Sequence, residues 1–406
     1  MSTVLEPLEL AKDKFAQGDM SECLRQLTFA FIQDTDNTEC YSLAIMCLRQ
    51  LGSENEAKLF ENALANFDDA RAFFDLGYHF IDVGHERLAI PLLLRAFRLA
   101  PGDSKIALEL AIALCGQFQP RAAREALLQC KLDSNFWISY QFHWSSLLCG
   151  ITDGAEAFIK ESRRTFLAQT ATHEIKGALY ALDKLDELRL RFSVVKKPEA
   201  HIMHWHFIQY GSAILDYFDD SMGQQGLQVA GGRWVYVGIS YLQLNVTLLK
   251  LKRLLAELGR TPSIVLSVPD RDSIIIANGI SRILGLPMTV VPDMENTAWE
   301  ESLLVAANNW NFSGAPLERV MKNQIVFAFN HNWLEQGPNT PDIIGMMSQY
   351  CTWPWSKERL VIDPVTNERT EAVEDSREPE EIALEFSKEL DEKDIAFDDV
   401  LEFYKK

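Results

Sequence analysis

Residues 70–101 read ARAFFDLGYHFIDVGHERLAIPLLLRAFRLAP, with apolar residues at helical spacing on both sides of a short turn. The spacing predicts one helix over residues 70–82 and a second over 86–99. The small side chains of Gly77 and Ala89 allow these helices to pack closely, and the closing proline cannot continue a helix. The stretch therefore predicts an antiparallel helical hairpin with a defined beginning and end.

The same pattern recurs three more times in the first third of the chain. Residues 104–135 repeat it after 34 residues, and residues 9–35 repeat it upstream. Residues 40–67 fit with a slip of one residue, and a more divergent helix pair is expected over 135–169. A further amphipathic helix is expected over 174–192. Because consecutive units share one period, the sequence predicts an array of stacked repeats.

These units resemble the tetratricopeptide repeat, whose period is about 34 residues. The resemblance implies a helical superhelix that binds proteins or peptides on a concave face, formed by the first helix (the A helix) of each unit. Members that clamp a C-terminal carboxylate carry Lys and Asn at fixed positions that this chain lacks, so we expect a partner with an apolar segment. An equally open alternative is that the rest of this chain fills that face. The binding groove, here called the A-helix face, is expected to comprise Arg71, Phe74, Tyr78, Ile81, Lys105, Leu108 and Ile112.

From residue 233 onward the pattern changes to alternating strands and helices. Such alternation predicts a parallel, three-layer α/β sheet. One helix is inferred from a Thr-x-x-Glu capping box at Thr297, and another from Asp272 near its N-terminus. The expected strands cover residues 233–240, 263–270, 286–293 and 323–330, and the expected helices cover 244–260, 272–285, 296–310 and 340–351.

The predicted fold is thus a tetratricopeptide-type helical superhelix followed by a parallel three-layer α/β domain and an acidic, partly helical tail. The expected domains are residues 1–195, 196–355 and 356–406. The tail holds 17 acidic and 8 basic residues, with apolar residues placed between the charges. This composition predicts either a solvated tail or a short helix that docks in the groove of the repeats, intramolecularly or on a second copy of the chain.

Charge and cysteine content restrict the class of function. The chain has 39 Lys and Arg against 58 Asp and Glu, and the net charge of −19 argues against a nucleic-acid surface. The first residues lack the basic and apolar regions of a signal peptide, and no uncharged run reaches the roughly 18 residues of a spanning helix. The seven cysteines form no C-x-x-C pair, which is typical of free thiols in a reducing compartment. We therefore expect a cytoplasmic protein that binds neither nucleic acid nor membrane.

Residues 283–291 read ILGLPMTVV, a helix–turn–strand pattern. With its surroundings, residues 235–330, it resembles a phosphoribosyltransferase-like, Rossmann-like α/β fold. The resemblance implies a ligand site at the carboxyl ends of the strands, with an acidic pair and a loop that binds phosphate. In this chain Asn330 and His331 stand in place of the acidic pair, and Pro338 offers no N–H to a phosphate. The candidate catalytic residues are Asp270, Asp272, Asp293 and His331.

Three histidines raise the alternative of a metal site, because zinc binds imidazole nitrogen. On a helix His201 and His204 would share a face, whereas on a strand His204 and His206 would. No H-E-x-x-H pattern accompanies them. Packing against neighbouring aromatic residues is therefore the favoured interpretation, and no cofactor is expected.

Together these observations favour a protein–protein interaction scaffold or adaptor whose α/β domain is non-catalytic. The alternative is a sugar-phosphate or nucleotide transferase whose repeats recruit a protein substrate. The two hypotheses differ in what Asp270 and Asp293 do, because only an enzyme should need them for turnover.

Overall fold

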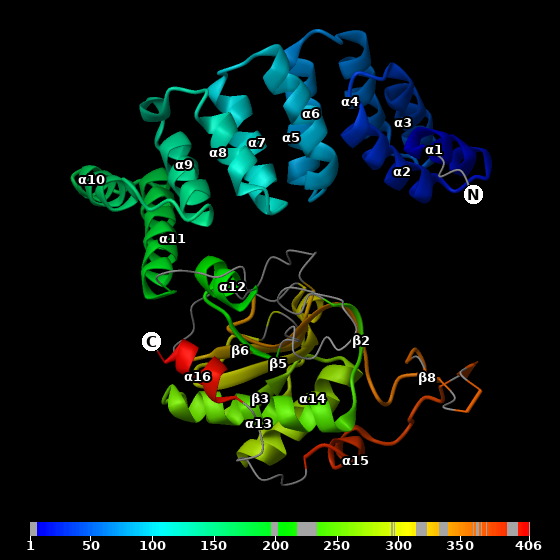
Figure 1. The fold of residues 1–406 in the computed structure, drawn as a ribbon, viewed down its shortest axis with the longest axis vertical. Coiled ribbons are helices and arrows are strands. Elements are labelled where there is room, and N and C mark those ends of the chain that lie inside the picture. The colour runs from blue at the N-terminus through cyan, green and yellow to red at the C-terminus, as the bar shows by residue number, and fades with distance from the viewer. Residues whose placement is uncertain are drawn as a thin grey trace. The chain divides into compact units, whose positions relative to one another are not determined.

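A computed structural model gives the fold of the chain (Figure 1). The chain divides into two compact units, Met1–Arg189 and Leu190–Lys406. The first unit is helical and the second is built on a parallel sheet, which confirms the predicted fold class. The finer division into three domains stays a prediction. The structure describes residues 6–195, 202–216, 234–293, 295, 297–313, 323–332, 340–359, 361–362, 365–366, 368–370, 372–387 and 397–405.

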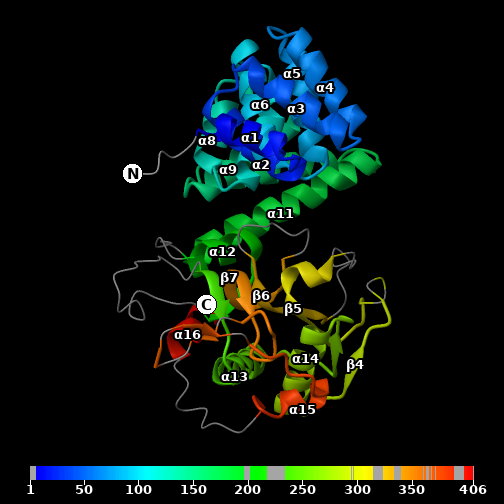
Figure 2. The same ribbon diagram turned by 90° about the vertical axis from the view of Figure 1, so that its right-hand side faces the viewer.

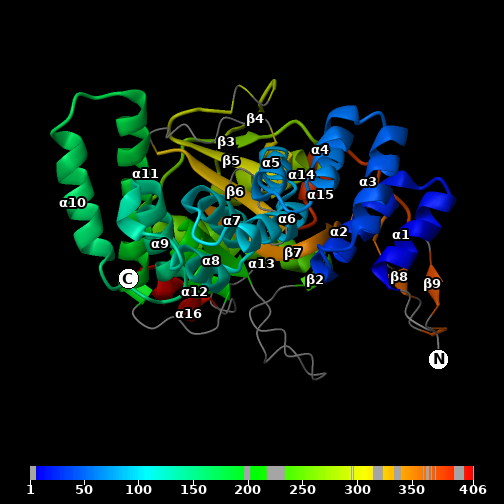
Figure 3. The ribbon, with the colours of Figure 1, turned by 90° about the horizontal axis from the view of Figure 1, so that it is seen from above.

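The first unit consists of helix pairs that follow one another along the chain, as Figure 3 shows for α1 to α8. The clearest predicted hairpin is found as α5 and α6, and the predicted helix over 174–192 is found as α11. The elements are α1 (Pro7–Ala16), α2 (Met20–Gln33), α3 (Thr38–Gln50), α4 (Glu54–Ala65), α5 (Ala70–Asp82), α6 (Glu86–Leu99), α7 (Ser104–Gly116), α8 (Pro120–Leu127), the 3-10 turn η1 (Leu132–Ser134), α9 (Phe136–Leu148), α10 (Ala155–Leu167) and α11 (His173–Val195).

An Asn or Asp side chain caps the start of the A helix in four successive repeats. Asn37, Asp69, Asp103 and Asn135 accept hydrogen bonds from backbone N–H groups in the first turns of α3, α5, α7 and α9. These residues lie 32 to 34 positions apart, so the caps follow the period of the repeat. Each cap fixes where its A helix begins, and therefore which side chains share one face of the array.

Close packing within a repeat depends on Gly77, as predicted. A Cβ atom at this position would lie 2.7 Å from the Cγ of Leu93 on α6, well inside van der Waals contact. Ala89 is fully buried on the same helix. The small residues therefore set the distance between α5 and α6.

The second unit contains a sheet in which every pairing is parallel. The strand order is β1-β7-β6-β5-β3-β4, and β2 also pairs with β7. The strands are β1 (Ala213–Asp216), β2 (Trp234–Gly238), β3 (Ile264–Ser267), β4 (Met288–Val290), β5 (Ser302–Asn308), β6 (Ile325–His331) and β7 (Ile343–Thr352). The other elements are α12 (Ile202–Tyr210), α13 (Tyr241–Glu257), α14 (Arg271–Leu284), the 3-10 turn η3 (Asn309–Phe312), the antiparallel pair β8 (Val361–Ile362) and β9 (Arg369–Thr370), α15 (Pro379–Ala383) and α16 (Asp398–Tyr404).

Side chains of the central strand β5 alternate between two buried layers. Leu303 and Val305 belong to the core that includes residues of α13 and α14, whereas Leu304 and Ala306 pack with Phe312 on the opposite face. Figure 2 shows α13 and α14 on one side of the sheet and α12 on the other. The sheet is thus buried on both faces, which is usual for parallel strands.

Two of the predicted helices are wrong, because residues 296–310 and 340–351 contain the strands β5 and β7. All seven residues of β5 are buried, and the five in its middle, Leu303 to Ala307, form a continuous apolar run. Periodicity alone does not distinguish such a run from a buried helix. The apparent capping box at Thr297 favoured a helix, and this interpretation was wrong. Strand β1 was not predicted, and the cap of α14 is Asp270 rather than Asp272.

The described part of the tail docks on the second unit itself. Ile382, Phe386, Phe397 and Leu401 are all buried in the core that also contains α13 and α14. The ring of Phe386 occupies the space above Gly279, where a Cβ atom would lie 2.3 Å from it. At the edge of the sheet, the hydroxyl of Tyr404 accepts a hydrogen bond of 2.7 Å from the N–H of Ile214.

Candidate functional site

The A-helix face of the repeats is centred on the buried ring of Phe74. The guanidinium of Arg71 lies 5.5 Å from the centroid of this ring and the ammonium of Lys105 lies 5.0 Å from it. The ring of Tyr78 stacks on Phe74 one helical turn later, at 5.7 Å between centroids. The structure thus brings four of the predicted residues together, on the neighbouring helices α5 and α7.

An apolar ladder crosses this face. Met46 on α3, Tyr78 on α5 and Ile112 on α7 are 47%, 39% and 41% exposed, whereas most large apolar residues of the unit are buried. They stand at equivalent positions of three successive A helices, 32 and 34 residues apart. Ile81 and Leu108 are half-buried nearby on the same helices. Sequence analysis missed Met46, although its spacing from Tyr78 could have identified it.

Charges are distributed unevenly around the ladder. Arg71 forms an ion pair of 2.8 Å with Asp75 on its own helix. Glu109 is half-buried on α7, and burial together with the nearby carboxylate of Asp82 raises its pKa. Lys105 opposes this shift without reaching ion-pair distance of Glu109. The face therefore combines an apolar centre with both cationic and anionic side chains.

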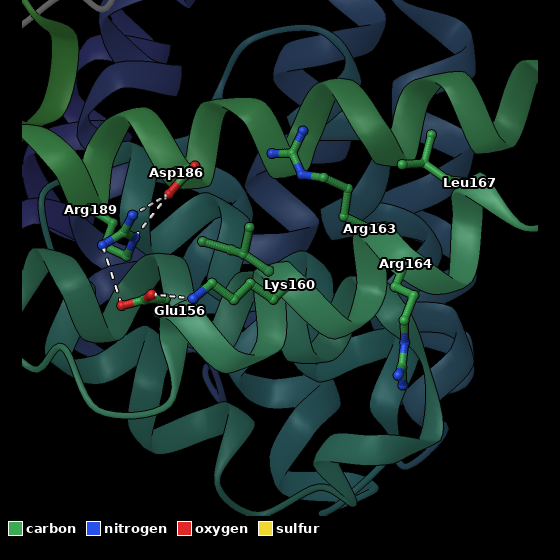
Figure 4. A pocket seen from close by; sticks show the side chains of 8 residues that line it. Glu156, Lys160, Arg163, Arg164, Leu167, Asp186 and Arg189 are labelled. Atoms are coloured by element: carbon green, nitrogen blue, oxygen red, sulfur yellow. Dashed lines mark hydrogen bonds and ion pairs between the residues drawn. The ribbon is translucent and has the colours of Figure 1, made fainter.

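A shallow pocket of about 240 Å³ lies between α10 and α11 (Figure 4). Its basic side chains are neutralised by carboxylates of the same two helices. Lys160 pairs with Glu156 at 2.6 Å, and Arg189 pairs with Asp186 at 2.8 Å and with Glu156 at 3.7 Å. Because these charges are already satisfied, the pocket offers a weaker basis for ligand recognition than the A-helix face. The lining residues are Glu156, Ile159, Lys160, Arg163, Arg164, Leu167, Asp186 and Arg189.

In the second unit, the candidate aspartates at the start of α14 make structural contacts. Asp270 accepts hydrogen bonds from the N–H (2.9 Å) and hydroxyl (2.6 Å) of Ser273 and so caps the helix. Asp272 accepts a 2.7 Å hydrogen bond from the indole N–H of Trp355. Burial raises the pKa of Asp272, while this bond lowers it. Both carboxylates thus hold protein groups in place.

The third group in this turn, Arg271, is held by the chain's own C-terminal segment. Its guanidinium donates to the backbone carbonyls of Asp375 at 2.7 Å and Arg377 at 2.9 Å. Together with Trp355, this segment covers the N-terminal end of α14. Asp293 is exposed and accepts a hydrogen bond from the backbone N–H of Glu295.

His331 lies at the end of β6 and is buried. Its ring packs edge-on against His206 of α12, with 5.4 Å between the centroids. Burial lowers the pKa of His331 to about 4. At neutral pH the imidazole is therefore uncharged. Its neighbour His206 is one of the three histidines that the sequence analysis considered as metal ligands.

The remaining candidate histidines have different surroundings. His204 stacks on Phe403 of the tail at 4.8 Å, and His206 also contacts the ring of Tyr210 at 4.7 Å. His201 lies outside the described residues. Within the described part of the chain, no three His, Cys, Asp or Glu side chains are grouped so that they could hold a metal ion.

A buried amide network across β5, β6 and β7 was missed by sequence analysis. The side-chain amide of Asn330 donates to the Oδ1 of Asn308 at 3.1 Å, and the hydroxyl of Ser348 donates to the Oδ1 of Asn330 at 2.6 Å. Since these buried polar atoms satisfy one another, the network holds the middle of β7 beside the carboxyl ends of β5 and β6. The sequence signal for it was the occurrence of Asn at the ends of two apolar strands.

Comparisons with known proteins show limited similarity. No protein-family model and no curated protein matches the chain. Similar solved structures include a MamA protein, with 17% identity over 41% of this chain and 96% of that chain, at a TM-score of 0.26. A thermophilic TPR protein of Thermus thermophilus shows 14% identity over 43% of this chain and 97% of that chain, at a TM-score of 0.26. A purine phosphoribosyltransferase of Pyrococcus horikoshii shows 14% identity over 32% of this chain and 98% of that chain, at a TM-score of 0.24.

At such identities and scores these similarities support no functional argument. The fold assignment rests on the helices, strands and pairings described above. Among the described residues, none of the helices combines the length and the apolar character that crossing a bilayer requires.

Proposed function

We propose that this chain is an adaptor that binds an apolar segment of a partner protein on its A-helix face. The observation that carries the proposal is the apolar ladder of Met46, Tyr78 and Ile112, which repeats in register on three successive A helices. Exposed apolar side chains aligned on rigid helices favour the docking of an amphipathic peptide. Each of these half-exposed side chains would contribute about 1 kcal/mol when a partner covers it.

We further propose that the α/β unit supports binding rather than catalysis. Asp270 caps a helix, and Asp272 accepts a hydrogen bond from Trp355. The guanidinium of Arg271 donates to a backbone carbonyl of the chain itself. A carboxylate in such a role is poorly placed to exchange protons or to bind a sugar hydroxyl. The seven cysteines are free, and six of them are buried, which supports a reducing compartment such as the cytoplasm.

The test compares partner capture by three forms of the full-length chain. One is wild type, and one carries Met46→Ala, Tyr78→Ala and Ile112→Ala. A matched control carries Leu94→Ala and Leu128→Ala, which remove apolar side chains that are 38% and 48% exposed elsewhere in the same unit. Proteins captured from native lysate are quantified by mass spectrometry.

We expect specific partners to be retained by wild type and by the control but lost from the ladder variant. Equal capture by all three forms would contradict the assignment of the A-helix face. A small phosphorylated molecule that copurifies with the chain, and that Asp270→Ala releases, would instead support the transferase alternative.

A further inference from the structure

The cations on the A-helix face are already engaged within the face. Arg71 is paired with Asp75 at 2.8 Å and lies over Phe74. Lys105 rests 5.0 Å above the same ring, in a cation–π contact. Neither cation therefore depends on an acidic group from outside.

The carboxylates beside the ladder are in the opposite situation. Asp82 is exposed at the end of α5, and Glu109 lies half-buried on α7, which contacts α5. The carboxylate of Asp82 contributes to the raised pKa of Glu109. In the part of the chain that the structure describes, neither of them reaches ion-pair distance of a Lys, Arg or His side chain. The face thus carries two neighbouring negative charges without a direct counter-ion, next to the exposed Tyr78 and Ile112.

On this basis we propose that the segment bound by the A-helix face is amphipathic and basic. Its apolar residues cover the ladder, and an adjacent Lys or Arg lies between Asp82 and Glu109. The inference rests on the proposed function of the face and specifies the chemistry of its partner.

Other partner chemistries fit the same contacts less well. An acidic segment would add a third negative charge beside Asp82 and Glu109. A purely apolar segment would cover Glu109 further and leave it without a counter-ion, which is costly for a carboxylate. A basic segment removes the repulsion, and the net charge of −19 also steers a cationic partner toward the chain.

The experiment uses a display library of random 16-residue peptides, selected on the full-length chain. A Tyr78→Ala, Ile112→Ala variant serves for counter-selection, so that only peptides that need the ladder are kept. We expect the retained peptides to share two or more apolar residues at helical spacing and at least one adjacent Lys or Arg. Retained peptides that are neutral or acidic would overturn the inference while leaving the proposed function intact.

Affinities of one selected peptide are then measured by fluorescence anisotropy. We expect Asp82→Asn with Glu109→Gln to weaken binding by about fivefold, the effect of losing two partly exposed ion pairs. The control is Asp133→Asn with Glu161→Gln, because these carboxylates are 80% and 77% exposed elsewhere in the same unit. Equal losses in both double variants would indicate long-range attraction only and would reject the proposed contact.

A third outcome would reject the proposed function itself. If no peptide depends on Tyr78 and Ile112, the A-helix face is not a peptide site. The proposed function then fails, and the inference about its partner fails with it.

Discussion

The two units of this protein are held together by contacts that differ in sequence separation. In the helical unit the most extensive contacts join helices that follow one another along the chain, as α1 with α2 and α5 with α6. In the α/β unit, β1 pairs with β7 across more than a hundred residues, and the tail completes the core. The A-helix face of the repeats is therefore built from contacts that are local in the sequence, whereas the core of the second unit also depends on residues of the C-terminal tail.

The largest expected effect comes from deleting α16 by ending the chain at residue 396. The deletion removes buried Phe397 and Leu401 from the core and exposes the edge strand β1. Since losing one buried Phe or Leu costs about 2–5 kcal/mol, the loss approaches the whole stability of a domain. We expect the tryptophan fluorescence transition that reports on buried Trp353 and Trp355 to disappear.

The matched control removes α1 by starting the chain at residue 18. Ala11 is the one buried residue of α1, so this terminal helix contributes less to its core. We expect a lower but still cooperative transition of the helical unit, measured by circular dichroism. Equal effects of the two deletions would show that the α/β unit does not depend on its terminal segment more strongly than the helical unit does.

A smaller effect is expected from pH, through His331. Burial lowers its pKa from 6.5 to about 4, so the unfolded chain binds a proton at a higher pH than the folded chain does. Stability is therefore complete above pH 6.5 and is lost as the pH falls toward 4, by about 3 kcal/mol in total. His331→Gln should remove this part of the pH dependence.

The ring of His206, which packs on His331, and the ring of Tyr210, which packs on His206, both remain in the variant and serve as internal references. The measurement is urea unfolding of wild type and His331→Gln at several values between pH 4 and 7. Parallel stability curves for the two proteins would show that His331 does not titrate in this range.

The helical unit was predictable from sequence because its determinants lie close together along the chain. Gly77 packs against Leu93 only 16 residues away, and the caps Asp69 and Asp103 bind residues two or three positions further on. In the α/β unit the relevant neighbours are remote. Strand β5 was predicted as a helix because nothing in its sequence, SLLVAAN, shows that β3 and β6 flank it.

The same reason explains the candidate site. Four residues of the A-helix face are in contact with one another because α5 and α7 are successive A helices. By contrast, the contact of Asp272 with Trp355 spans 83 residues, and the pairing of His331 with His206 spans 125. No local pattern encodes such contacts, so the roles of these residues could not be predicted.

The next prediction compares two glycines within helices. Gly279→Ala on α14 places a methyl group against the ring of Phe386, and we expect a loss of roughly 2 kcal/mol from overpacking. Gly177→Ala on α11 meets no atom within 4 Å, and we expect a gain of about 0.5–1 kcal/mol from helix propensity. Adding Phe386→Leu to Gly279→Ala should restore part of the loss. Equal changes in the two single variants would mean that Phe386 does not occupy this space.

The last prediction concerns two tyrosine hydroxyls, one in each unit. Tyr404→Phe leaves the buried N–H of Ile214 without its acceptor, and Tyr41→Phe removes a 2.8 Å hydrogen bond to the carbonyl of Thr35. Each change should cost about 1 kcal/mol. Because the hydroxyls stabilise separate cores, Tyr404→Phe should lower the tryptophan transition of the α/β unit, and Tyr41→Phe the transition of the helical unit. If either substitution shifts both transitions, the two units unfold together. Their folds then differ, but their stabilities are coupled.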